Sequence, residues 1–413
     1  MKKKIIVIAY KFPPFPGVGA YRWSKLCKYL AKAGYQIHVI TVNWKKTTMN
    51  TLDDDIHHKN IKIHRIGSMY PLGLFSRRDQ NLLYKLIFKL FQICIGKILY
   101  FDDMAQLWGW RLVPYCQNLI KKEKISVVIA TGHPFQSNRW AAIIKRRNNS
   151  IKLIQDFRDP WANDPDIKRN FFSRIMIQRW QRFSVEGADA VVAVTKGLLE
   201  FFIDSDSNIK EKGVVIRNGV DTEFSIKGIR RSKKIPKNII KIIYAGSLGN
   251  KRDMVLCELL KVIEKKIDIY HTIKIDIFGG SSGYISSKFK SLISREVINF
   301  YPAVKQKELF KKMAEYNYAL HLNNKGNYFA ASTKIYEYAF LKIPTFSLNY
   351  GGELDYLVKK FDLGISVNLE IDNLELKIGE LISDKRKYKF KGIEQFSYSY
   401  IAQQYSDLIQ SMV

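Results

Sequence analysis

The sequence predicts an α/β protein built from two Rossmann-like domains. Short apolar runs rich in β-branched residues are typical of strands, and longer stretches with helical periodicity separate them. Strands that alternate with helices predict βαβ units and a mostly parallel sheet. The alternation pauses once, in the polar and basic segment 221–238, and then starts again. A chain of 413 residues is long enough for one core on each side of that connector.

The elements follow one another in a regular order. In the first half the predicted strands are KKIIVIAY, YQIHVITV, NIKIHRI, ISVVIATG, IKLIQDF, AVVAVT and GVVIRNG. In the second half they are IIKIIYAGS, IKIDIFGG, VINFYPAV, YNYALHLNN, IPTFSLNY and LGISVN. We therefore expect an N-terminal domain over 1–220, a linker over 221–238, a C-terminal domain over 239–390 and an amphipathic last helix within 391–413 that packs back on the junction.

The composition is globular and strongly basic. Hydrophobic residues make up 46% and aromatic residues 13% of the chain, which excludes a disordered protein. The formal net charge of +30 favours anionic partners such as nucleic acid, lipid headgroups or phosphorylated substrates. A bias toward lysine on a solvated surface explains the excess equally well. The sequence contains no aromatic-basic recognition motif, so we expect no nucleic-acid partner.

The N-terminus and the cysteines indicate a cytoplasmic protein. The segment MKKKIIVIAYKFPPFPG resembles a secretory signal, but its apolar core is short and proline follows it, which favours a first strand. No run reaches about 18 uninterrupted apolar residues, so we expect no transmembrane helix. The four cysteines share no close spacing, as is typical of ordinary thiols in a reducing compartment.

Candidate ligand-binding residues follow three predicted strands of the first domain, where ligands bind in open α/β sheets. After the first strand, Gly17 and Gly19 let a ligand approach the backbone, and Arg22 lies in the first turn of the next helix. A plain strand-to-helix turn is the alternative. His133 follows the fourth strand. The segment after the fifth strand contains Asp156, Arg158, Asp159 and Trp161. Either a polar pocket for hydroxyl groups or a structural ion pair of Arg158 explains that segment.

The second domain repeats this arrangement with basic residues. In YAGSLGNKRD, a strand and a glycine precede Lys251 and Arg252, which are well placed to pair with a diphosphate. In GNYFAASTKIYEYAF, small residues precede a helix that begins near Lys334 and carries Glu337 on the same face; they include Ser332 and Thr333. Glu337 would accept hydrogen bonds from ribose hydroxyl groups. A surface pair of Lys334 and Glu337 is the alternative.

Six segments together resemble a known family. FPPFPGVGAYR, DFRDPW, ADAVVAVTKGL, VIRNGVDTEF, YAGSLGNKRD and TKIYEYAFLKIP occur in the order typical of GT-B glycosyltransferases of the retaining group 1, also called family 4. The DFRDPW segment is similar to a branch common in bacterial surface-polysaccharide pathways. The resemblance covers nearly the whole chain. It implies two domains that face each other across a cleft, a nucleotide-sugar donor on the second domain and a glycan acceptor, lipid-linked or oligosaccharide, on the first.

The resemblance also implies roles for individual residues. As catalytic residues we expect Arg252, Lys334, Asp156, Arg158 and His133. As donor-binding residues we expect Glu337, Lys251, Ser332, Thr333, Gly17 and Gly19. On the acceptor side we expect Arg22, Asp159 and Trp161.

The sequence departs from the family pattern at two positions. Many members carry a second glutamate where this chain has Phe329, and an arginine where it has Ser247. We interpret the first change as altered sugar recognition in an active enzyme; a catalytically silent nucleotide-binding partner of a glycan-assembly complex is the alternative. A cationic clamp on the diphosphate makes a cofactor or metal unnecessary. The run 53–55 of three aspartates lies far from any phosphate signal, so we expect no metal site there.

One segment predicts contact with a membrane surface. Residues 81–101 contain no acidic residue, are apolar on most of the circumference, and gather Lys85, Lys89, Gln92 and Lys97 within one arc. A basic amphipathic helix of this kind lies in the headgroup region of a bilayer. A helix packed in the core of the first domain is the alternative. On the first interpretation the protein contacts the inner face of the cell membrane.

Overall fold

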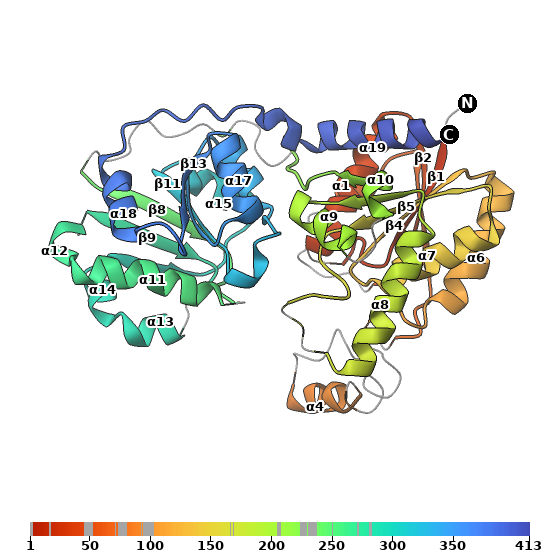
Figure 1. Cartoon of the computed structure of the whole chain (residues 1–413), viewed down its shortest axis with the longest axis horizontal. Coiled ribbons are helices and arrows are strands. Elements are labelled where there is room, and N and C mark those ends of the chain that lie inside the picture. Colours follow the sequence, from red (N-terminus) through yellow and green to blue (C-terminus); the bar gives the residue numbers. More distant parts are fainter. Residues whose placement is uncertain are drawn as a thin grey trace. The chain divides into compact units, whose positions relative to one another are not determined.

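The computed structural model consists of two compact units (Figure 1). The first comprises Met1–Arg217 with Ile401–Val413, and the second comprises Asn218–Tyr400. The structure describes residues 3–15, 18–44, 53–70, 72, 81–91, 93, 103–165, 167, 169–204, 208–223, 229, 238–249, 251–270, 272–280 and 283–413. Much of the predicted linker, over 224–228 and 230–237, lies outside these residues.

The first unit contains a parallel sheet whose seven described strands have the order β3-β2-β1-β4-β5-β6-β7. They are β1 (Lys4–Ala9), β2 (Gln36–Val42), β3 (Ile61–Ile66), β4 (Val127–Thr131), β5 (Lys152–Phe157), β6 (Ala190–Ala193) and β7 (Gly213–Val215). The chain moves outward from β1 to β3 and then returns to place β4 beside β1. The carboxyl ends of β1 and β4 therefore flank the topological switch point, where ligands bind in such sheets.

Helices follow most of these strands. They are α1 (Val18–Lys32), α2 (Asp53–Ile56), α4 (Leu82–Phe91), α6 (Gly109–Glu123), α7 (Gln136–Arg147), α8 (Phe171–Glu186), α9 (Lys196–Ile203) and α10 (Ile209–Lys212). Side-chain caps fix two of the helix starts: Asn170 accepts from the N–H of Ser173 in α8, and Thr195 accepts from the N–H of Leu198 in α9. No helix in the described part of the chain combines the length and apolar character that crossing a bilayer requires.

The second unit repeats the plan with six described parallel strands in the order β10-β9-β8-β11-β12-β13. They are β8 (Ile240–Ala245), β9 (Ile273–Phe278), β10 (Ile298–Tyr301), β11 (Tyr318–Leu322), β12 (Thr345–Asn349) and β13 (Gly364–Asn368). The helices are α11 (Arg252–Lys265), α12 (Ile267–Tyr270), α13 (Gly283–Lys288), α14 (Lys290–Ser294), α15 (Gln306–Met313), α16 (Lys334–Phe340), α17 (Gly352–Lys360) and α18 (Leu374–Ser383). The switch point lies between β8 and β11.

The sequence pattern that predicted these strands has a simple cause. Strands in the middle of a parallel sheet are covered by helices on both faces, so they read as continuous apolar runs. Every residue of β1 from Ile5 to Ala9 has no exposed surface. The prediction of an α/β chain with two Rossmann-like sheets is confirmed.

The C-terminal segment belongs to both units in turn. The short 3-10 helix η3 (Ile393–Phe396) packs in the second unit, where the Phe396 ring lies 4.8 Å from the rings of Tyr336 and Phe361. Helix α19 (Tyr398–Met412) then continues into the first unit (Figure 1). There Tyr405 packs edge-on against Trp23, with ring centres 5.2 Å apart.

Candidate functional site

The loop after β8 lies at the carboxyl edge of the second sheet. Gly246 has a φ of +127°, a conformation that favours glycine, and its N–H donates to the carbonyl of Phe278 at 2.7 Å. A methyl group built on Gly246 would lie 2.5 Å from Lys334 Nζ. The ammonium group of Lys334 therefore rests directly against this backbone, and only glycine leaves room for it.

Lys334 is the first residue of α16 and is half-buried. Its Nζ lies 4.5 Å from the centre of the Tyr244 ring, on β8. Burial and the charge of Arg252 lower the pKa of Lys334 to about 8, although Glu337 opposes the shift. A lysine whose charge is destabilised by burial and by a second cation is stabilised again when an anion binds beside it. This arrangement favours an anionic ligand at Lys334.

Glu337 lies one turn further along α16. Burial raises the pKa of its carboxyl group to about 7, against the effects of Gln306 and Lys334. Gln306 Nε2, at the start of α15, donates to Glu337 Oε1 at 3.0 Å. The carboxylate is thus held by Gln306 and does not form the surface pair with Lys334 that the sequence also allowed. The carboxylate oxygens have further lone pairs that can accept hydrogen bonds from hydroxyl groups of a ligand.

The other predicted residues of the second unit flank this pair. Arg252 begins α11, is half-buried, and interacts electrostatically with Tyr244, Lys334 and His321. Lys251 precedes it in a left-handed conformation, with φ of +62°, and is exposed. Thr333 precedes Lys334 and makes no side-chain cap. The structure therefore brings Arg252, Lys334 and Glu337 together and leaves Lys251 at the rim.

His321 belongs to this cluster and was not predicted from the sequence. It lies on β11, is 4% exposed, and its Nε2 is 2.9 Å from Ser332 Oγ. Burial, Lys334 and Arg252 lower the pKa of His321 to about 3, so the ring is neutral near pH 7. A neutral ring can orient the Ser332 hydroxyl group without adding a third positive charge. The only sequence signal was one polar residue inside the apolar run YALHL.

In the first unit, Asp156 at the end of β5 has no exposed surface. Its Oδ2 accepts from Trp23 Nε1 at 2.7 Å and from Thr131 Oγ1 at 3.0 Å. Its Oδ1 accepts from the Tyr405 hydroxyl group at 2.7 Å. Burial alone would raise the pKa of Asp156, but Arg22 and these donors outweigh it and hold the pKa below its usual range.

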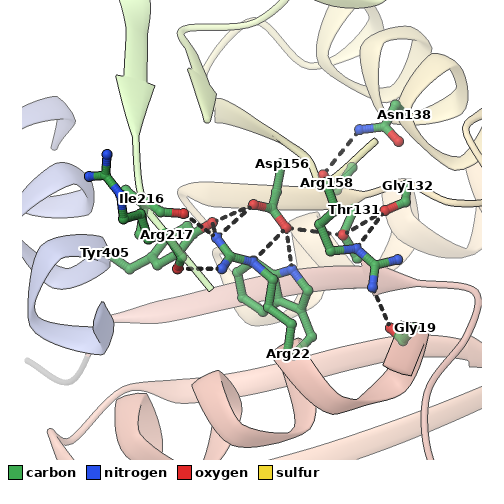
Figure 2. Close-up of polar contacts among 12 residues, drawn as sticks. Gly19, Arg22, Thr131, Gly132, Asn138, Asp156, Arg158, Ile216, Arg217 and Tyr405 are labelled. Carbon is green, nitrogen blue, oxygen red and sulfur yellow. Dashed lines mark hydrogen bonds and ion pairs between the residues drawn. The ribbon is translucent and has the colours of Figure 1, made fainter. Parts of the chain in front are cut away.

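Arg22 completes this buried cluster and is 2% exposed. Its Nη2 and Nε donate to the two oxygens of Asp156 at 3.1 and 3.3 Å. It also donates to the backbone carbonyls of Ile216 and Arg217 at 2.9 and 2.7 Å (Figure 2). The arrangement ties α1, β5, α19 and the end of β7 together. Asp156 and Arg22 therefore hold these elements of the first unit together with almost no exposed surface, and the catalytic and acceptor-side roles expected for them stay predictions.

Arg158 and His133 lie at the carboxyl edge of the same sheet. Arg158 is half-buried and donates from Nε to the carbonyl of Gly132 at 3.0 Å and from Nη1 to that of Gly19 at 3.3 Å (Figure 2). Two nitrogens of its guanidinium group thus bind backbone carbonyls of the loop that follows β4 and of the first turn of α1. Burial, Lys11 and Arg158 lower the pKa of His133 to about 3. A neutral His133 is available as a hydrogen-bonding group at this edge.

The remaining first-unit residues divide between surface and core. Asp159 is exposed, and Trp161 is 3% exposed with its ring stacked on Phe135 at 5.4 Å. Gly17 lies outside the described residues. Lys11, which the sequence analysis did not single out, follows β1; burial and the charge of Arg158 lower its pKa. Lys11 thus adds a cation to the edge formed by Arg158 and His133.

The acidic run 53–55 has a structural partner. The carboxylate of Asp55 lies 2.5 Å from Lys25 Nζ and 3.4 Å from Lys28 Nζ. Among the residues that the structure describes, no three histidine, cysteine or acidic side chains are grouped in a way that could hold a metal ion.

The first half of the chain is similar to a known family. Residues 20–224 match Glycosyltransferase Family 4. No curated protein sequence is significantly similar to the chain.

Solved structures show the fold over the full length. The apo form of the lipopolysaccharide outer core galactosyltransferase WaaB has a TM-score of 0.64 at 15% identity, with 100% of both chains covered. Anabaena Alr3699/HepE in complex with UDP-glucose has a TM-score of 0.60 at 14% identity, with 99% of both chains covered. The catalytic domain of starch synthase IV from Arabidopsis thaliana, bound to ADP and acarbose, has a TM-score of 0.64 at 9% identity, with 100% of this chain and 99% of that chain covered. The fold is that of GT-B glycosyltransferases.

Proposed function

We propose that the protein is a retaining glycosyltransferase that moves a sugar from a nucleoside diphosphate sugar to a lipid-linked glycan acceptor. The reaction would belong to the synthesis of bacterial surface polysaccharide. The observation that carries this proposal is the cluster of Lys334, Arg252 and Glu337 at the switch point of the second sheet. Two neighbouring cations against a glycine backbone suit a diphosphate, and a carboxylate one turn away suits ribose hydroxyl groups. The match of residues 20–224 to Glycosyltransferase Family 4 supports the reaction class.

In this proposal the second unit supplies charge to the leaving group. As the bond between the anomeric carbon and the diphosphate breaks, negative charge grows on the phosphate oxygens, and Lys334 and Arg252 stabilise it. Such preorganised cations do the work that a divalent ion does elsewhere, so we propose transfer without a metal. The oxygen of the acceptor hydroxyl group forms its bond to the anomeric carbon on the face that the diphosphate leaves, and an oxygen of the departing diphosphate takes the hydroxyl proton. Formation of the new bond on that same face gives retention.

The first unit would hold the acceptor at the edge where Arg158, His133 and Lys11 gather. A neutral His133 exchanges hydrogen bonds with hydroxyl groups, whereas Arg158 and Lys11 attract an acceptor that carries phosphate. Asp159 is exposed at the same loop and can accept from sugar hydroxyl groups. In this proposal Asp156 and Arg22 do not contact the acceptor; they fix the positions of β5 and α1, and thereby the shape of this edge.

The test begins with binding. A thermal-shift panel of UDP-, GDP-, ADP- and dTDP-sugars identifies the donor, because a ligand that binds only the folded state raises the midpoint. Release of nucleoside diphosphate from that donor, with and without acceptor glycans, then measures turnover. We expect Lys334→Ala to abolish the shift and the turnover, whereas Lys265→Ala, at the exposed far end of α11, leaves both unchanged. No shift with any donor would contradict the proposal.

Two further outcomes separate the alternatives. Many family members carry a glutamate where this chain has Phe329, whose side chain is buried at 4% exposure. Because phenylalanine has no carboxylate, its side chain cannot accept hydrogen bonds from the donor sugar. A silent nucleotide-binding partner would bind the donor but show neither transfer nor slow hydrolysis. Loss of turnover in chelator, restored by a divalent ion, would contradict metal-independent transfer while leaving the donor site intact.

A further inference from the structure

Helix α4 of the first unit exposes its apolar side chains to solvent. Leu82 is 84%, Leu83 62%, Leu86 55%, Leu90 51% and Ile87 41% exposed. The expected alternative of a core-packed helix is therefore wrong for this part of 81–101. At about 100° per residue, these five side chains cover an arc of roughly 140°. Several large apolar side chains exposed together on one helix indicate a binding surface.

The beginning of α8 provides a second exposed apolar group. Phe171 is 61% and Phe172 71% exposed, and their rings contact each other edge-on at 5.8 Å. Ile167, just before the helix, is 46% exposed. Figure 1 shows α4 and the beginning of α8 at the same lower end of the first unit. Two phenylalanines at the tip of a helix are costly to leave in water unless a partner covers them.

The charged side chains of α4 and of α8 before its last residue are all positive. Lys85 and Lys89 of α4 are exposed and border its apolar arc, and α4 contains no acidic residue. Arg174 and Arg179 are exposed on α8, which has no acidic residue before Glu186 at its end. Basic side chains that flank an apolar face match the interfacial region of an anionic bilayer. A second copy of the same chain would bring these cations together, which disfavours a dimer through this face.

We propose that α4 and the beginning of α8 form one docking face for an anionic lipid bilayer. The leucines of α4 and Phe171 and Phe172 enter the boundary between headgroups and acyl chains, while Lys85, Lys89 and Arg174 contact lipid phosphates. The face lies outside the donor cluster of the second unit, so it adds to the proposed function a surface that brings the enzyme to lipid-borne acceptors. Turnover of a soluble donor tests the reaction separately from the docking.

The experiment is co-sedimentation of the full chain with vesicles of phosphatidylcholine alone or with 30% phosphatidylglycerol, at about 50 and 500 mM salt. We expect binding to the anionic vesicles, weakened at high salt because the surface charges are screened. Leu83→Glu/Leu86→Glu and Phe171→Ser/Phe172→Ser should each lower the partition coefficient about tenfold or more. Ile371→Glu, a matched change of a 78% exposed residue in the second unit, should leave it unchanged.

Hydrolysis of the soluble donor should stay unchanged in both double variants, since none of the four residues belongs to the donor cluster. Equal partition of wild type and the double variants would overturn the proposal. So would a dimer, measured by light scattering, that either double variant converts to a monomer while vesicle binding persists, because the face would then join two copies of the chain.

Discussion

Each unit holds a cluster of charged side chains at the carboxyl edge of its sheet, buried in the first unit and half-buried in the second. The two clusters differ in how their charges are satisfied. In the first unit, Asp156 accepts from Arg22, Trp23, Thr131 and Tyr405, and Arg22 has further carbonyl acceptors. In the second unit, Lys334 faces a second cation and a glycine backbone. The pKa of Asp156 is held below its usual range, whereas the pKa values of Lys334 and Glu337 move toward neutrality.

This difference distinguishes a structural ion pair from a binding site. A carboxylate whose pKa is lowered by internal donors is already stabilised in its charged form and gains little from a ligand. A lysine and a glutamate whose charged forms are disfavoured by burial gain stability when a ligand supplies the missing partner. We therefore propose that Asp156 holds the first unit together and that Lys334 binds the ligand.

The largest expected effect is loss of stability in Asp156→Asn. The change leaves the Arg22 charge without its partner in a site with almost no exposed surface, which costs about 3–5 kcal/mol. For a domain of this size the first unfolding midpoint falls by roughly 10 °C. Thermal denaturation measures it, and the exposed Asp159→Asn is the matched control. If Asp156→Asn kept its midpoint but lost turnover, the comparison of the two clusters would be reversed.

The next effect is on activity. Lys334→Met removes a cation from the developing charge of the leaving group, so we expect turnover to fall about 10²–10³-fold. The unfolding midpoint without ligand should change little or rise, because the substitution relieves a buried charge beside Arg252. Steady-state kinetics and a ligand-free melt give both values. A midpoint loss as large as that of Asp156→Asn would mean that Lys334 also holds its unit together.

Gly246→Ala sharpens the same point with a smaller change. The added methyl group would lie 2.5 Å from Lys334 Nζ, at a φ that disfavours alanine, so the ammonium group must move. We expect nucleoside diphosphate affinity to fall about tenfold, within the range of a displaced charge-assisted hydrogen bond. Gly249→Ala, where a methyl group meets nothing within 4 Å, is the matched control. Calorimetric titration measures the affinity of both variants for the nucleoside diphosphate. Equal affinities of Gly246→Ala and Gly249→Ala would mean that the phosphates do not bind beside Gly246.

Most of the fold could be predicted from the sequence, because strands that are buried on both faces consist of continuous apolar runs. The site was only partly predictable. Arg252, Lys334 and Glu337 follow strand ends and meet at one edge, as their positions indicated. The buried hydrogen bonds of Asp156 could not be predicted, because its donors Trp23 and Tyr405 come from distant segments of the sequence. In the sequence alone, the segment around Asp156 resembles a binding motif. His321 was not predicted as a site residue, because a single polar residue within an apolar strand is usually interpreted as part of the core.

The pH dependence of nucleotide binding tests the two shifted groups together. Below about pH 7 Glu337 is protonated and, without its negative charge, accepts hydrogen bonds from ribose more weakly, and above about pH 8 Lys334 loses its charge. We therefore expect the affinity for the nucleoside diphosphate to be highest between pH 7 and 8 and to fall up to tenfold per pH unit on each side. Titrations from pH 5.5 to 9.5 measure the profile. Glu337→Gln should flatten the acid side and Lys334→Met the alkaline side.

The smallest expected effect concerns His321, which acts through Ser332. Its neutral ring, 2.9 Å from Ser332 Oγ, orients that hydroxyl group beside Lys334 and Arg252. His321→Phe keeps a ring but removes the hydrogen bond, so we expect affinity for the diphosphate to fall a few-fold, as for one neutral hydrogen bond. His321→Gln, which can still reach Ser332, should restore most of it, and Ser332→Ala should show no further loss when combined with His321→Phe. Additive losses in the double variant would show that the two residues act independently and that the histidine only fills space between β11 and α16.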